Sequence, residues 1–375
     1  MRKQKFTFFI LSLLLALILI QCYPKDEKHP IIKTRIALLN PSVGYLESFI
    51  SLIENEIINI DNLGLTLVIY LKARNDLEKI SNLLQNNKYP YITIKTVNCD
   101  LQEDILFHKN ECSAIFYQIF KESDAILFFG GPDFPPSIYK EKTKLLTEIV
   151  DPYRHYFEIS FIFHLLGGSQ NTSNQAFLEE DPDFTIVGFC LGMQTMNVGT
   201  GGTMYQDIPT EIYQVQYMED ILVLDPDQQH RNYWWHLSAD ELVMRNSFHR
   251  IKFNKQHHFF DKLIANSLST PTVYSSHHQA IKNIGQGFQI IATSMDGKIA
   301  EVIVHKKYKN VFGVQFHPEF SKLYFNCGDE YKLTPKDTVL VSPNQVLKEK
   351  NSLSFHKRFW YYFAELMNIL HTKGH

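Results

Sequence analysis

The sequence predicts an α/β protein, a three-layer sandwich with a mostly parallel central sheet, and three observations support this class. Nearly continuous apolar runs alternate along the chain with stretches of helical spacing. Glycine-bearing turns follow several of the apolar runs. The composition, 45% hydrophobic and 21% charged over 375 residues, is that of a folded globular chain. Uninterrupted apolar strands between helices are typical of a parallel sheet covered on both faces.

Strands are expected at the apolar runs, residues 34–39, 65–70, 91–97, 125–129, 185–189, 288–293, 299–305 and 310–316. Helices are expected at residues 45–58, 153–166, 191–197 and 354–370. In the last of these, Phe359, Phe363 and Leu366 recur at four- and three-residue spacing, which predicts an amphipathic helix packed on the core. Residues 199–268 are rich in aromatics and His and are expected to be irregular.

The charge balance excludes one class of partner. Lys and Arg number 37 and Asp and Glu number 40, which gives a net charge of −3. No long basic run occurs in the chain. Because nucleic-acid binders concentrate positive charge on one surface, nucleic acid is not an expected partner.

The amino-terminal segment has the layout of a secretory signal. Arg2, Lys3 and Lys5 precede an almost unbroken apolar run over residues 6–20. This run is shorter than the roughly 20 residues that a membrane-spanning helix needs. We therefore expect export from the cytoplasm.

The segment ends in Leu-Ile-Gln-Cys at Cys22, which resembles a bacterial lipoprotein cleavage site. The predicted organisation is a signal peptide at 1–21, a polar tether at 22–33 and one folded domain at 34–375. Lipidation of Cys22 would anchor the protein to a membrane of the cell envelope. A plain secretory signal with a fortuitous Cys and an uncleaved anchor are the alternatives.

The other cysteines are too few for a disulfide scaffold; with Cys22 they are Cys99, Cys112, Cys190 and Cys327. Cys99 and Cys112 could pair, or each could be a buried, inert thiol. The sequence leaves this pairing open.

Cys190 stands at a predicted turn between a strand and a helix, in the run Gly-Phe-Cys-Leu-Gly at 188–192. The flanking glycines permit a sharp bend that lifts the Cys side chain out of the sheet. The amino terminus of the following helix favours a thiolate there and offers backbone N–H groups to a developing oxyanion. A buried Cys in a tight turn is the simpler alternative.

A second motif, Gly-Val-Gln-Phe-His-Pro-Glu at 313–319, ends another strand. Residues two apart on an extended segment share a side, so Glu319 can hold the His317 imidazole. The imidazole could then take the proton of Cys190. Together the three residues supply a nucleophile, a base and a residue that orients the base. A surface His next to Pro is the alternative.

The motifs resemble those of the class I glutamine amidotransferase-like superfamily, and the resemblance covers roughly residues 125–320. They are Gly130-Gly-Pro-Asp133, Gly188-Phe-Cys-Leu-Gly-Met-Gln194 and Gly313-Val-Gln-Phe-His-Pro-Glu319. Three stretches are similar to the peptidase C26 branch: Asn197-Val-Gly-Thr-Gly-Gly-Thr-Met-Tyr-Gln-Asp207, Ser276-His-His-Gln279 and the stretch from Asp133 to Tyr139. That branch contains γ-glutamyl-γ-aminobutyrate hydrolases and γ-glutamyl hydrolases.

The resemblance implies a covalent mechanism without a cofactor. Cys190 attacks the δ-carbonyl of a γ-glutamyl amide, His317 protonates the leaving amine, and water hydrolyses the thioester. The backbone N–H groups of Leu191 and of the turn at Gly131 would hold the oxyanion.

The resemblance also implies substrate-side residues. Gln194 either faces the bound glutamyl group or is a polar residue of the helix start. His277 and His278 are expected to line the substrate side of the cleft. No metal is expected, because the 16 His residues form no H-E-x-x-H motif and no C-x-x-C motif accompanies them. Trp234, Trp235 and His236 either roof the pocket or pack a long loop.

Three functions follow as hypotheses. The first is an exported, lipid-anchored hydrolase acting on a small γ-glutamyl substrate. The second is a glutaminase subunit that feeds ammonia to a synthase, and the third is a non-catalytic lipoprotein with this fold. An exported chain has no access to an ATP-dependent synthase, so no synthase partner is expected. A complete Cys190, His317 and Glu319 set argues against the third hypothesis.

Overall fold

The computed structural model describes residues 34–264, 269–326 and 328–372, and these fall within one compact unit. The expected signal peptide, the tether and Cys22 lie outside the described residues, and so does Cys327. None of the described helices combines the length and apolar character needed to cross a bilayer.

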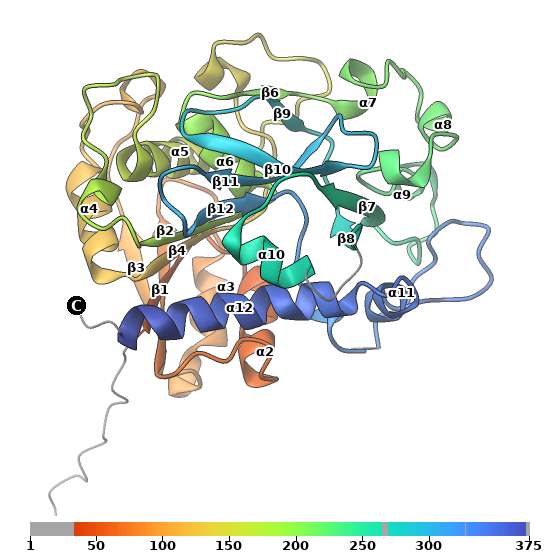
Figure 1. Ribbon diagram of the computed structural model, residues 1–375, viewed down its shortest axis with the longest axis horizontal. Helices are drawn as coiled ribbons and strands as arrows, with labels where there is room; N and C mark the ends of the chain where they lie inside the picture. The colour runs from red at the N-terminus through yellow and green to blue at the C-terminus, as the bar shows by residue number, and fades with distance from the viewer. Residues whose placement is uncertain (1–33, 265–268, 327, 373–375) are drawn as a thin grey trace, which may run out of the picture. The chain divides into compact units, whose positions relative to one another are not determined.

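The central sheet of the described residues has ten strands, in the order β3-β2-β1-β4-β5-β12-β11-β10-β7-β8 (Figure 1). Six neighbouring strands pair in parallel: β3 (Ile92–Val97), β2 (Leu63–Tyr70), β1 (Thr34–Leu39), β4 (Ala125–Phe128), β5 (Thr185–Phe189) and β12 (Val311–Val314). Four further strands extend the sheet in antiparallel fashion: β11 (Ala300–His305), β10 (Phe288–Ser294), β7 (Ser247–Phe253) and β8 (Thr272–Ser275). A separate pair joins β6 (Thr203–Tyr205) to β9 (Ala280–Asn283).

Two apolar clusters, one on each face of the sheet, produce the layers. Successive β1 residues alternate between them, with Leu38 in one cluster and Leu39 in the other. The first cluster includes α2 (Val43–Glu54), α3 (Leu77–Leu83), α10 (His258–Ile264), α11 (Pro343–Glu349) and α12 (Leu353–Thr372). The second includes α4 (Ser113–Glu122), α5 (Pro152–Leu166) and α6 (Leu191–Gly199). The predicted α/β sandwich with a mostly parallel sheet is confirmed.

The expected strands match the observed ones to within two residues at each end. The helix expected at residues 45–58 ends earlier than predicted, because α2 ends at Glu54. There Asn55 caps the helix through its backbone N–H, and Glu56 adopts a left-handed φ of 58°, a common way to stop a helix. The carboxyl-terminal helix α12 packs on the core as expected, with Phe359, Trp360 and Phe363 fully buried.

The expectation that residues 199–268 are irregular was wrong. This segment contains β6 and β7 together with α10 and the short helices α7 (Ile208–Glu211), α8 (Met218–Ile221) and α9 (Trp234–Leu237). In β7, His249 and Ile251 are buried while Arg250 is exposed. The strand thus keeps its period of two, but a His takes an inward position that an apolar residue would normally occupy.

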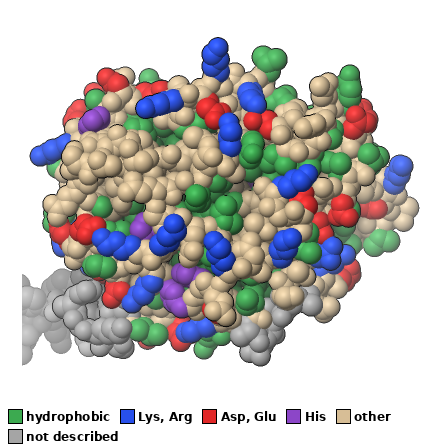
Figure 2. All heavy atoms as spheres, turned by 45° about the horizontal axis from the view of Figure 1, so that its top comes forward, with side chains coloured by type: hydrophobic (Ala, Val, Ile, Leu, Met, Phe, Trp, Pro, Cys, Tyr) green, Lys and Arg blue, Asp and Glu red, His purple; other side chains and the backbone are tan. Residues whose placement is uncertain are grey.

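Cys99 and Cys112 form a disulfide, with their Cα atoms 5.4 Å apart, which settles the pairing that the sequence left open. The bond ties the segment after β3 to the start of α4, and both residues belong to the second apolar cluster. Elsewhere on the surface, Figure 2 shows one face on which basic and acidic side chains are interspersed.

Candidate active site

Cys190 lies at the junction of β5 and α6, where the chain leaves the sheet. It is the N-cap residue of α6, with φ 51° and ψ −105°, and its backbone N–H donates to Val314 O of β12 at 2.8 Å. A Cβ on Gly192 would stand 2.2 Å from Phe128 O, so only glycine lets α6 approach β4 this closely. The predicted turn therefore holds the sulfur at the amino terminus of a helix.

His317 and Glu319 form the closest polar contact beside this cysteine. His317 Nδ1 lies 2.7 Å from Glu319 Oε1, and both residues are buried. The His317 side chain also hydrogen-bonds to Cys190. The imidazole therefore contacts both residues that the sequence analysis pairs with it, Glu319 and Cys190. The backbone N–H of His317 donates to Tyr274 O of β8 at 2.9 Å, which fixes the chain here.

The electrostatics favour a charged imidazole. Burial by itself would lower the pKa of His317, but the charges on Glu319 and Cys190 and the hydrogen bonds to both raise the pKa to about 10. The ring therefore carries a proton at neutral pH. A protonated ring at this position can act as a general acid toward a leaving group.

The turn after β4 lies against His317 and against Leu191, the residue after Cys190. A Cβ on Gly130 would stand 2.8 Å from His317 Cε1, and one on Gly131 would stand 2.8 Å from Leu191 Cδ2. Leu191 is the first residue of α6, so its N–H has no acceptor within the helix. The residues expected to hold an oxyanion are thus brought together around Cys190.

Arg154 was not singled out from the sequence, yet it holds this turn. Its Nη2 donates to Phe129 O and to Gly130 O, each at 3.2 Å, and its Nε donates to the fully buried Glu158 at 2.8 Å. The signal available in the sequence is a pair of opposite charges four residues apart within an otherwise apolar helix.

Gln315 is a second residue that was missed. Its Nε2 donates to Cys190 Sγ at 3.5 Å, and its Oε1 accepts from Gln194 Nε2 at 3.2 Å. Gln194 is buried and also contacts Gln279 O at 3.4 Å. Gln194 therefore lies behind the nucleophile with its amide paired inside the protein. Gln315 lies two residues before His317, just after β12 ends at Val314, within the same motif of residues 313–319.

The two neighbouring histidines point to different surroundings. His278 lies 3.1 Å from Asp133 and 3.1 Å from Asp207. Burial opposes its charge, but these two carboxylates raise its pKa to about 9. His277, by contrast, is only 4% exposed, and its Nδ1 contacts Gln279 O at 2.8 Å. The structure thus places His278 between two carboxylates at the edge of a pocket and His277 in the interior, away from the cleft position expected for it.

A pocket of about 180 Å³ opens in front of His278, and its lining includes Arg231, Tyr233 and His236. Trp234 and Trp235 do not line this pocket, and Trp235 is 39% exposed with the Arg245 guanidinium 5.2 Å from its ring centre. Of these three residues only His236 lines the pocket, and neither Cys190 nor His317 is part of its lining.

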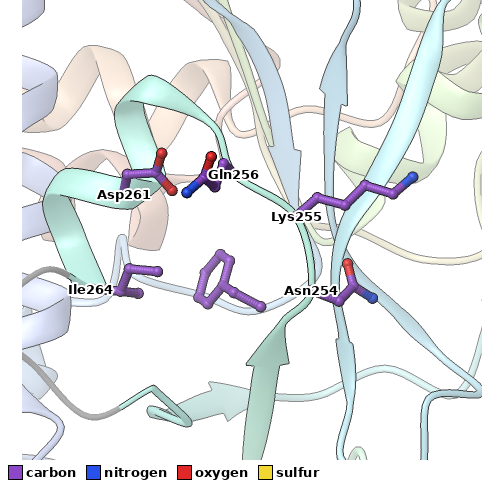
Figure 3. Close-up of a pocket in the computed structure, with 6 residues that line it drawn as sticks. Asn254, Lys255, Gln256, Asp261 and Ile264 are labelled. Carbon is purple, nitrogen blue, oxygen red and sulfur yellow. The ribbon is translucent and has the colours of Figure 1, made fainter.

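A larger pocket of about 450 Å³ lies between the end of β7 and α10, beside Lys255, Gln256 and Asp261 (Figure 3). None of its lining residues belongs to the set around Cys190. Its size therefore does not point to the chemistry.

The fold and this site define a cysteine-dependent protein of the amidohydrolase and amidotransferase type. A parallel sheet presents a cysteine at a strand-to-helix turn, with His and Glu beside it. Residues 72–319 match the family model of peptidase C26. Because the match spans more than half of the chain, the protein belongs to the peptidase C26 family, and the match begins further upstream than the resemblance seen in the sequence.

The relatives include a protein named as glutamine amidotransferase-like. The glutamine amidotransferase-like protein YvdE of Lactococcus lactis is 31% identical over 196 residues, a match that spans 52% of this chain and 66% of that protein, just under two thirds. Protein NtpR of Enterococcus hirae is 26% identical, over 66% of this chain and 90% of NtpR. A crystal structure of a GMP synthase-type protein from Thermoplasma acidophilum covers 83% of this chain and 97% of its own, with 12% identity and a TM-score of 0.38.

Proposed function

We propose that this protein is a γ-glutamyl hydrolase, which cleaves the amide bond of small γ-glutamyl substrates through a thioester on Cys190. The observation that carries the proposal is the buried Cys190, His317 and Glu319 set, in which the carboxylate holds Nδ1 of the imidazole at 2.7 Å and the imidazole contacts the sulfur. In this arrangement Cys190 is the nucleophile, His317 is the base, and Glu319 orients the base.

The reaction follows from the positions of these groups. The Cys190 thiolate attacks the δ-carbonyl carbon, and the carbonyl oxygen becomes an oxyanion held by the Leu191 and Gly131 N–H groups. When the C–N bond breaks, protonated His317 gives its proton to the leaving amine. Neutral His317 then takes a proton from water, whose oxygen attacks the thioester and releases the glutamyl carboxylate with the thiol restored.

The pocket in front of His278 suits the amino-acid end of the substrate. Arg231 is partly buried there and its Nε has no hydrogen-bond partner among the described residues, so it is available to a substrate α-carboxylate. Glu148 and Asp207 line the same pocket and offer negative charge to an α-amino group. His278 lines this pocket and contacts Asp133, which lies two residues after Gly131 in the chain, and this supports a substrate position beside the turn.

Export and lipid anchoring through Cys22 complete the proposal. The Cys99–Cys112 disulfide supports it, since such bonds persist in oxidising compartments outside the cytoplasm. Incorporation of a labelled fatty acid should occur in the wild type and be lost in Cys22→Ala. Equal labelling of both proteins would contradict the anchor.

The catalytic experiment is a panel of γ-glutamyl amides and free glutamine, assayed with purified full-length wild type, Cys190→Ala and Lys255→Ala. We expect release of amine by the wild type, no release by Cys190→Ala, and unchanged release by Lys255→Ala, whose side chain lines the other pocket. Mass spectrometry should find a glutamyl adduct on wild-type Cys190 alone.

Three outcomes would contradict the proposal in different ways. Turnover by Cys190→Ala would refute the nucleophile. Ammonia release from glutamine alone would favour the glutaminase hypothesis. Binding of the γ-glutamyl compounds by both proteins, without turnover by either, would favour a non-catalytic role.

A further inference from the structure

Four buried side chains that no part of the proposed reaction uses converge behind the active site. They are His230, His249, His277 and Glu301, and one potential ligand atom from each lies within 4.8 Å of those of the other three. All four residues are between 0% and 4% exposed. Such a group of imidazoles and a carboxylate, sealed from water, needs a physical explanation.

The residues come from separate segments of the fold. His249 lies on β7 and Glu301 on β11, while His230 precedes α9 and His277 follows β8. The His230 backbone joins the group, because its carbonyl accepts from the His277 N–H at 3.1 Å. Four segments therefore direct polar side chains to one interior point.

Hydrogen bonds satisfy only part of this cluster. Glu301 Oε1 makes a hydrogen-bond contact with His249 Nε2 at 3.0 Å, and it lies 3.3 Å from His230 Nδ1 without hydrogen-bond geometry. His277 Nε2, both ring nitrogens of His230, His249 Nδ1 and Glu301 Oε2 have no hydrogen-bond partner in the described part of the chain. Unpaired buried polar atoms are destabilising, so a cluster with five of them is missing a partner.

The His277 ring is oriented as a ligand. Its Nδ1 contacts Gln279 O at 2.8 Å, and a carbonyl can only accept, so Nδ1 carries the proton. The lone pair is then on Nε2, the atom without a partner among the described residues. Metal-binding histidines typically donate their other ring N–H to a carbonyl or carboxylate in this way.

We propose that His230, His249, His277 and Glu301 bind one divalent transition-metal ion, with Zn²⁺ as the best fit. Imidazole nitrogens and carboxylate oxygens are both Zn²⁺ ligands in proteins, and four protein ligands would close its coordination shell. At bond lengths of about 2.0–2.1 Å, tetrahedral ligand atoms lie about 3.3 Å apart. Glu301 Oε1 has nearly this spacing from His249 Nε2, at 3.0 Å, and from His230 Nδ1, at 3.3 Å. With His277 Nε2 as the fourth ligand, an ion would give a partner to two of the five unpaired atoms, His277 Nε2 and His230 Nδ1.

A closed shell gives the ion a structural task and leaves it no direct part in the reaction. The Glu301 carbonyl accepts from the Gln315 N–H at 2.8 Å, and the Gln315 side chain contacts Cys190 Sγ. The ion would therefore fix β7, β11 and the segment around His277 behind the nucleophile. Metal binding at this cluster does not depend on the substrate proposed above.

The test is metal analysis of the full-length protein, purified without a histidine tag. Elemental analysis should find about one equivalent of metal per chain. After removal by a chelator, calorimetric titration with Zn²⁺ alone should return a stoichiometry of one, and Co²⁺ should give the visible absorption of a tetrahedral site. Zn²⁺ should also raise the melting temperature of the stripped protein.

Three variants locate the site. His249→Gln and Glu301→Gln should bind Zn²⁺ at least about 100-fold more weakly, because loss of even an outer partner of a ligand costs 10–100-fold. His356→Gln is the matched control, since His356 is equally buried but lies in α12 with Thr272 O as its partner. It should keep full affinity.

The spectroscopic and binding measurements on the wild type stand even if a ligand variant fails to fold. A wild type that neither retains metal nor binds Zn²⁺ or Co²⁺ after stripping would overturn the proposal. Equal Zn²⁺ affinity in wild type and folded His249→Gln would overturn the location. In either case the γ-glutamyl assay would be unaffected, so the two proposals fail separately.

Discussion

At the scale of single residues, the nucleophile turn combines strain with function. Cys190 has a φ of 51°, a region that costs an L-residue with a Cβ roughly 1–2 kcal/mol. Strained backbone is retained at functional sites when the surroundings over-determine it. Here the N–H of Cys190 is bound to Val314 O, and α6 begins at the next residue.

This strain predicts a difference between two inactive variants. Cys190→Gly and Cys190→Ala both remove the sulfur, but only glycine adopts the positive φ without cost. We expect Cys190→Gly to be more stable than Cys190→Ala by about 1 kcal/mol, measured as the free energy of unfolding in urea. Equal stabilities would show that the turn is not strained.

Glu319 allows a second residue-scale prediction. Its charge raises the pKa of His317, so Glu319→Gln should lower that pKa while keeping a hydrogen-bonding side chain. Turnover should fall by about 10²–10⁴-fold, the usual contribution of a positioned acid or base. NMR titration of His317 in both proteins measures the pKa directly. An unchanged pKa would contradict the assigned pairing.

At the scale of elements, close contact between α6 and β4 positions the site. Gly192 lies against the Phe128 carbonyl, whereas a Cβ added to Gly44 in α2 would meet nothing within 4 Å. Substitution of Gly192 therefore tests the packing of α6 on β4, whereas substitution of Gly44 tests only the helix propensity of the residue.

We expect Gly192→Ala to destabilise the protein by about 1–3 kcal/mol, because α6 must move away from β4. Gly44→Ala should be neutral or stabilising by up to about 1 kcal/mol, since alanine favours the helix. Thermal unfolding of both variants checks this. Similar effects at the two positions would mean that the contact is not decisive.

At the scale of the whole molecule, buried histidines of two kinds determine how stability depends on pH. Burial lowers the pKa of His305 and His356 to about 4, below the unfolded value near 6.5. His317 is the opposite case, with a pKa of about 10. The folded protein therefore excludes protons at the first two residues and holds one at the third.

The sign of each effect follows from linkage. Below pH 6.5 the unfolded chain binds protons that folded His305 and His356 do not, so stability falls as the pH drops from about 6.5 to 4. Between pH 6.5 and 10 folded His317 holds a proton that the unfolded chain has lost, so its contribution to stability falls as the pH rises. The melting temperature should be highest near pH 6–7. In Glu319→Gln the alkaline slope should be shallower, and an unchanged slope would contradict this account.

The sequence by itself determined the fold class and the set around Cys190, because both depend on short-range patterns. Apolar runs identify strands, a glycine-flanked turn identifies the cysteine, and a spacing of two places Glu319 beside His317. Only the tertiary structure decided what lies around them. It brought Arg154 to the turn at Gly130 and Gly131, and Gln315 to the sulfur of Cys190. It also brought His277 into an interior cluster with His230, His249 and Glu301. Those contacts join segments far apart in the chain, and no local spacing records which side chains a folded sheet will bring into contact.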